Sequence, residues 1–128
     1  MENHPANNFN EKYREKTKQF AVDLCRQFNH FQNGESAKLV IRQLIRSGTS
    51  VAANFRAATR ARSQAEYYAK ICVVVEECDE TQFWFEILED ACLVKKETIV
   101  NLHDTITELL KILTATKYKL HQKRFPQK

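Results

Sequence analysis

The side chains of this sequence that are best suited to chemistry are basic residues with few acids beside them, and they fall in two zones. In the first zone Glu66 is the only nearby acid. Its members are Arg56, Arg60, Arg62 and Lys70. The second zone follows Glu108 and contains no acid. Its candidate binding residues are Lys117, Lys119, Lys123 and Arg124.

Lys and Arg at this density attract the phosphates of nucleic acids by releasing counterions, and aromatic neighbours can stack on unpaired bases. Tyr118 and Phe125 are such neighbours in the second zone. We therefore predict that the eight bases bind RNA or DNA. The alternative is that the basic C-terminal tail is solvated surface that keeps the protein soluble.

A second polar feature is a seam formed by Arg46, Ser50 and Asn54, which recur at steps of four and so share one helix face. Two interpretations stay open for it. The seam binds a ligand, or it serves the specificity of the fold.

Charge is strongly segregated along the chain. Residues 36–65 contain six bases and no acid, whereas residues 75–91 contain seven acids and no base. If these segments form an antiparallel hairpin, Arg46 lies level with Asp79 or Glu80. Much of the segregation is then internal pairing, which contributes only about 0–1 kcal/mol for an exposed pair.

The sequence lacks the patterns that enzymes and metal sites use. It has no Gly-rich phosphate loop, no nucleophile elbow and no His-Glu-x-x-His spacing, and Ser63 is better explained as a helix cap. Four cysteines form no Cys-x-x-Cys pair and occupy helical apolar positions, which predicts reduced core thiols. They are Cys25, Cys72, Cys78 and Cys92. We expect no catalytic residues, no metal and no cofactor.

The composition is that of a single all-α domain. The chain has 128 residues, a net charge of +4, two glycines and two prolines, and it is 43% hydrophobic and 28% charged. These proportions suit helices with one buried and one solvated face. The longest apolar run, 71–75, is far too short to span a membrane, and the first ten residues are polar, so we expect a cytoplasmic protein.

Apolar spacing predicts four helices, over about 9–30, 36–60, 64–90 and 96–120. Their similar lengths and short connections predict an antiparallel up-down-up-down four-helix bundle over residues 9–120. Residues 1–8 are expected to be a disordered lead-in and residues 121–128 a basic tail.

Within the second predicted helix, the small residues Gly48, Ala52 and Ala53 would let a neighbouring helix approach closely. This helix also contains the most specific motif of the sequence, Arg46-Ser47-Gly48-Thr49-Ser50-Val51 followed by Asn54-Phe55-Arg56. Arg60-Ala61-Arg62-Ser63 and the later Ala69-Lys70, Asp79-Glu80-Thr81 and Trp84 complete the pattern.

From roughly residue 20 to 113, this pattern resembles the four-helix-bundle proteins encoded in intervening sequences of bacterial 23S ribosomal RNA genes, also called S23 ribosomal proteins. One position departs from the family: Ala57 stands where a Glu is usual. The family is also similar to the accessory proteins of diversity-generating retroelements, which form pentameric barrels, bind nucleic acid and assist a reverse transcriptase.

The resemblance implies a homopentamer, with RNA or DNA and a reverse transcriptase or another protein as partners. Together with the two basic zones it predicts a non-enzymatic, homo-oligomeric bundle that binds nucleic acid through basic surface. The alternative is a structural or adaptor oligomer that docks a protein partner and does not bind nucleic acid.

Overall fold

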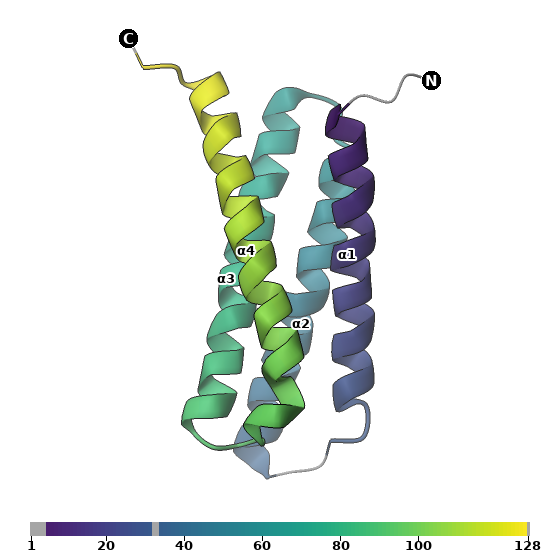
Figure 1. The fold of residues 1–128 in the computed structure, drawn as a ribbon, viewed down its shortest axis with the longest axis vertical. Coiled ribbons are helices and arrows are strands. Elements are labelled where there is room, and N and C mark those ends of the chain that lie inside the picture. The colour runs from purple at the N-terminus through teal and green to yellow at the C-terminus, as the bar shows by residue number, and fades with distance from the viewer. Residues whose placement is uncertain (1–4, 32–33, 128) are drawn as a thin grey trace.

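In a computed structural model, which describes residues 5–31 and 34–127, the chain forms four long helices. They are α1 (Pro5–Phe28), α2 (Glu35–Thr59), α3 (Gln64–Asp90) and α4 (Lys96–Arg124). Successive helices run in opposite directions, so the start of α1, the α2–α3 connection and the end of α4 lie at one end of the bundle (Figure 1). The predicted four-helix bundle is confirmed.

The helix boundaries follow local chemistry. The hydroxyl of Ser63 accepts a hydrogen bond from the Glu66 backbone N–H at 3.1 Å and so caps α3 as predicted. The Glu66 carboxylate, however, accepts from the Arg62 N–H at 3.4 Å and not from the cap residue itself. Gly34 precedes α2 with φ +58°, a left-handed conformation that glycine adopts without strain. Residues 32–33, part of the predicted turn, lie outside the described chain.

Two boundaries differ from the sequence prediction. Residues 5–8, expected to be part of a disordered lead-in, belong to α1, because proline is favoured at the first helical position. At the other end, α4 continues past residue 120 to Arg124, so half of the predicted tail is helical. Pro126 is the first residue there that cannot extend the helix.

The core is formed by apolar side chains that face the bundle axis from all four helices. On α3 a stripe of side chains at alternating steps of three and four is buried, and it includes Ile71, Val74, Cys78, Phe85 and Leu88. α2 packs most extensively on α3, and α1 packs least on α4. The polar side chain of Thr17 in α1 is also fully buried, and its hydroxyl donates to the Tyr13 carbonyl at 2.7 Å.

Close helix approach occurs at Gly48, as the small-residue run predicts. A Cβ atom added there would lie 2.3 Å from Leu24 Cδ2 and 3.3 Å from Phe20 Cε2, so α1 fits against α2 only because this position has no side chain. Ala52 and Ala53 play a different part, since Ala52 is half-buried and Ala53 exposed.

A buried polar contact joins α2 to α3. The hydroxyls of Ser47 and Thr81 lie 2.9 Å apart, and both side chains are fully buried. Thr81 also lies 2.7 Å from the Glu77 carbonyl, and Ser47 lies 3.2 Å from the Leu44 carbonyl. The two hydroxyls are therefore satisfied without water, and they fix the register of the two helices.

Candidate nucleic-acid interface

The eight predicted binding residues gather at one end of the bundle. Arg56 and Arg60 end α2, Arg62 lies in the α2–α3 connection, and Lys70 is in the second turn of α3. The other four residues occupy the last turns of α4. Because α2 and α4 end where α3 begins, the fold brings two zones that are 47 residues or more apart in sequence to the same end (Figure 1).

Most of these cations keep their charge available to solvent. Six of the eight are exposed, and Lys70 and Lys117 are half-buried. Arg62 lies 3.6 Å from Glu66, a pair that is open to water. Within residues 5–31 and 34–127 the other seven make no ion pair. Their fields are therefore not cancelled locally.

The structure adds two cations that sequence reasoning missed. Arg14 and Lys18 of α1 face Arg56 and Arg60 of α2 across a groove whose floor includes Ala52 and Ala53. Glu15 is the only acid that lines it. The four-residue spacing of Arg14 and Lys18 indicates that both lie on one face of the helix. Glu11 and Glu15 lie between and beside these bases in the sequence, so the segment does not stand out as basic.

Further pockets lie at this end of the bundle. One lies between Arg62, Ser63 and the start of α4's last turn at Leu120, and another lies between Phe9, Lys119 and Leu120. Lys123 lines both, and it also lines a third hollow beside Tyr68 and Arg124. The end of the bundle is thus an uneven, basic surface and not a smooth cap.

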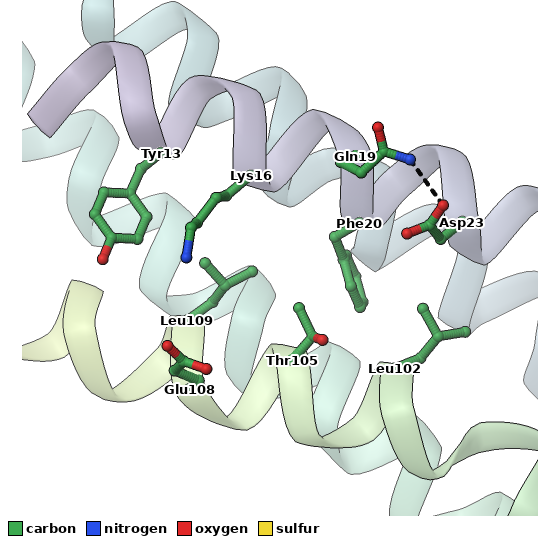
Figure 2. Close-up of a pocket in the computed structure, with 9 residues that line it drawn as sticks. All are labelled: Tyr13, Lys16, Gln19, Phe20, Asp23, Leu102, Thr105, Glu108 and Leu109. Carbon is green, nitrogen blue, oxygen red and sulfur yellow. Dashed lines mark hydrogen bonds between the residues drawn. The ribbon is translucent and has the colours of Figure 1, made fainter. Parts of the chain in front are cut away.

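The sparse packing of α1 on α4 leaves another groove lower down, drawn in Figure 2. Tyr13, Phe20, Leu102 and Leu109 supply its apolar side chains. Its charged residues are one base and two acids, namely Lys16, Asp23 and Glu108. Gln19 donates to Asp23 at 2.8 Å. The charge of this groove does not favour phosphate, so it is not part of the candidate interface.

Charge divides the molecule along its long axis. The basic half, residues 5–18, 49–75 and 109–127, contains thirteen Lys and Arg and three Asp and Glu. The acidic half, residues 19–31, 34–48 and 76–108, contains six Lys and Arg and twelve Asp and Glu. An anionic polymer is therefore attracted to the half that holds the described ends of the chain.

The polar seam is satisfied inside the protein. Arg46 pairs with Glu80, as the hairpin register predicts, and with Glu77 at 3.5 Å. The Asn54 amide donates to the Ser50 carbonyl at 2.9 Å and to the Ser50 hydroxyl at 2.8 Å. These contacts favour the interpretation that the seam serves the specificity of the fold.

The seam also ends without a carboxylate. Ala57, where the resemblance led us to expect Glu, lies three residues beyond Asn54 and therefore on the same helix face. Its methyl group is half-buried. Because this position carries no acid, nothing on the last two turns of α2 offsets the charge of Arg56 and Arg60.

The cysteines differ from the prediction of four core thiols. All four are free, but only Cys78 is buried, Cys72 is half-buried, and Cys25 and Cys92 are exposed. Both exposed thiols lie outside the stripes that the core uses, Cys92 in the α3–α4 connection with φ +53°. Burial raises the pKa of Cys78 to about 12, with smaller contributions from Glu77 and Asp79.

Neither a metal cluster nor a membrane span is evident in the part of the chain that the structure describes. No group of three or more His, Cys, Asp and Glu side chains there is arranged to hold a metal ion. No described helix is long and apolar enough to cross a bilayer. His103 and Glu89 form a local pair, with His103 Nδ1 2.9 Å from a Glu89 carboxylate oxygen.

Fold and surface together define a four-helix bundle with one basic end. A sequence profile of the 23S rRNA-intervening sequence protein family matches residues 10–115, and the chain belongs to that family. A solved structure that it resembles is a protein of unknown function from the S23 ribosomal protein family of Bacteroides thetaiotaomicron, with 28% sequence identity and a TM-score of 0.71. That alignment covers 81% of this chain and 96% of the other. A search among curated proteins found no significant match.

Proposed function

We propose that this protein is a non-enzymatic nucleic-acid-binding bundle that holds the phosphate backbone of RNA or DNA on its basic half. The observation that carries the proposal is the thirteen-to-three excess of bases in that half, built from two distant parts of the sequence and from α1. Contacts to phosphate position a protein on nucleic acid without reading its sequence. We therefore expect tight binding to the charged backbone of a nucleic acid, with little preference for one base sequence over another.

The groove between α1 and α2 is the part of this surface best suited to a phosphate backbone. Four cations from two helices face one another there, and the alanines at its floor let a ligand approach the helix backbone. Arginine adds geometric fit, because its planar guanidinium can donate two parallel hydrogen bonds to one phosphate.

The test is fluorescence anisotropy of a labelled structured RNA and a labelled DNA duplex over a range of salt concentrations. Binding should weaken linearly on a log-log plot, with a slope of about −0.9 for each phosphate contacted on a B-DNA duplex. A double variant, Arg56→Gln with Arg60→Gln, should bind about tenfold or more weakly and should lower the slope by about two.

The matched control is Lys38→Gln with Arg42→Gln, which removes two exposed cations from the other end of the same helix. It should leave the affinity within about twofold of the unaltered protein. If the protein binds neither nucleic acid even at low salt, the proposal is wrong. The adaptor alternative, in which the basic half docks an acidic protein, would then take its place.

We further propose that the bundle is a homo-oligomer, and the family resemblance suggests a pentamer. Large apolar side chains stay exposed on three helices of the single chain, at Leu39, Phe83 and Val100. Apolar side chains form the buried centre of contacts between like subunits. Size-exclusion chromatography with light scattering should give about five times the mass of 15.0 kDa, and a clean monomer would overturn this part of the proposal.

A further inference from the structure

An exposed group of aromatic rings lies in the basic half, where the start of α3 meets the end of α4. It consists of Tyr68, His121 and Phe125, hereafter the aromatic cluster. The Phe125 ring centroid lies 4.9 Å from that of His121 and 6.4 Å from that of Tyr68. Phe125 is 52% exposed and His121 is exposed, so the cluster presents ring surface to solvent.

The cluster is held in place by hydrogen bonds and does not belong to a loose tail. The Tyr68 hydroxyl lies 2.9 Å from His121 Nδ1, which ties α3 to α4. The Phe125 backbone N–H donates to the His121 carbonyl at 2.8 Å and caps the helix. A hydrogen bond with the Cys72 side chain is the main cause of a raised pKa at Tyr68. The extension of α4 beyond residue 120 is what positions these rings.

Cations border the rings. The guanidinium carbon of Arg124 lies 5.6 Å from the centroid of the Phe125 ring. Lys123 and Arg124 line a hollow together with Tyr68 and the polar side chain of Gln64. Exposed aromatic rings with cations around them form the combination that single-stranded nucleic acid binds, because each base offers a flat face and each linkage offers a negative charge.

Among the described residues, no second group of exposed rings has cations around it, and the exposed Tyr118 is a single ring between Lys117 and Lys119 in the sequence. Another aromatic pair, the exposed Phe83 with the half-buried Trp84, lies on α3 in the acidic half, close to Asp79, Glu80 and Glu86 in the sequence. Trp84 donates to Glu80 at 3.3 Å. A phosphate beside those rings would be repelled by the acids, whereas beside the aromatic cluster it would be attracted.

We propose that the aromatic cluster stacks an unpaired base and that the basic half therefore prefers single-stranded over double-stranded nucleic acid. This inference rests on the proposed nucleic-acid binding and adds the class of ligand. A base in a duplex is already stacked, and taking it out costs a few kcal/mol, which offsets the 1–3 kcal/mol that stacking on an aromatic side chain typically contributes. A single strand reaches the rings without that cost.

The experiment compares a fluorescein-labelled 12-nucleotide single strand with a duplex of the same length at the same salt concentration. The unaltered protein should bind the single strand more tightly. Phe125→Leu should weaken binding of the single strand about 5-fold to 150-fold, the range that corresponds to the loss of one stacked base. Binding of the duplex should stay within about twofold, and the salt slopes should not change, because no charge is removed.

Two further variants make the result specific. Phe125→Trp keeps an aromatic face at the same position and should restore the preference for the single strand. Lys38→Gln with Arg42→Gln, the double variant used above as a control, alters two exposed side chains of the acidic half and should leave the preference for the single strand unchanged. Because Phe125, Lys38 and Arg42 are all exposed, circular dichroism should report an intact helical fold in all three variants.

Each failure points to a different conclusion. If single strand and duplex bind equally and Phe125→Leu affects neither, the stacking inference is wrong while the proposed nucleic-acid binding stands. If Phe125→Leu weakens both ligands equally, the ring supports the basic surface and does not stack on a base, which also overturns the inference. If neither ligand binds the unaltered protein, the proposed function itself is wrong.

Discussion

At the scale of single residues, Cys78 shows how position within a helix determines the chemistry of a thiol. It lies on the inner face of α3, is fully buried, and has a pKa raised to about 12, whereas Cys25 and Cys92 face solvent. Only the thiolate is nucleophilic. We therefore expect iodoacetamide at pH 8 to alkylate Cys25 and Cys92 within the native protein and to leave Cys78 unmodified until denaturant is added, as read by peptide mass spectrometry. Modification of Cys78 as fast as Cys92 under native conditions would contradict the packing of α3.

The same thiol predicts how stability depends on pH. Its pKa is about 9.0 in an unfolded chain and about 12 in the folded protein, so between these values the folded state holds a proton that the unfolded state has lost. The free energy of unfolding should therefore fall as pH rises above 9, by about 1.4 kcal/mol per pH unit from this group. Urea denaturation at pH 8, 9, 10 and 11 measures the slope. Cys78→Ala should have a lower stability at pH 8 and a shallower decline above pH 9, and an unchanged slope would contradict the assignment.

At the scale of the helices, the contact between α1 and α2 depends on the missing side chain at Gly48. A Cβ atom there already meets Leu24, which is itself fully buried and cannot move away without disturbing the core. Gly48→Val should therefore lower the free energy of unfolding by about 2 kcal/mol. Ala53→Val, on the exposed face of the same helix, should cost only about 0.5 kcal/mol of helix propensity. Equal losses in chemical denaturation would mean that the helices are not in close contact at Gly48.

The helices also show what the sequence could and could not predict. The third helix was predicted almost completely, because its core stripe repeats without interruption and Ser63 provides a clear cap. The ends of α1 and α4 were misplaced, since the residues there are polar and their helical state depends on Pro5 and Pro126 more than on apolar spacing. The aromatic cluster could not be predicted, because it needs the register of α3 against α4 and the extra turn of α4.

The residues of the candidate interface could be predicted only in part. Eight of its cations could be identified because runs without acids stand out along the chain. Arg14 and Lys18 could not, because adjacent acids hide them in sequence and only the packing of α1 beside α2 brings them to Arg56 and Arg60. Cys25 was misassigned for a related reason, because spacing along a helix does not separate the core from its border. Cys92 was misassigned because it lies in the α3–α4 connection and not in a helix.

At the scale of the whole molecule, the segregation of charge makes the two ends of the bundle electrostatically different. Bases prevail in one half and acids in the other, and the centres of the two halves lie about 20 Å apart along helices that rise 1.5 Å per residue. At an ionic strength of 0.15 M the Debye length is about 8 Å, so the acidic half exerts little force on a ligand bound at the basic half. At 0.01 M it is about 30 Å, and the acids repel that ligand.

The dependence of the Debye length on salt leads to a final prediction about three exposed acids of α3. They are Glu76, Asp79 and Glu86, and none of them makes an ion pair among the described residues. A triple variant, Glu76→Gln with Asp79→Asn and Glu86→Gln, should bind a DNA duplex about tenfold more tightly at 0.01 M salt and less than about twofold more tightly at 0.15 M. Glu15→Gln is the control, because Glu15 lines the groove between α1 and α2, and its removal should strengthen binding at both salt concentrations. If the triple variant gains as much affinity at 0.15 M as at 0.01 M, the ligand lies beside α3's acids, and the basic half is not where the nucleic acid binds.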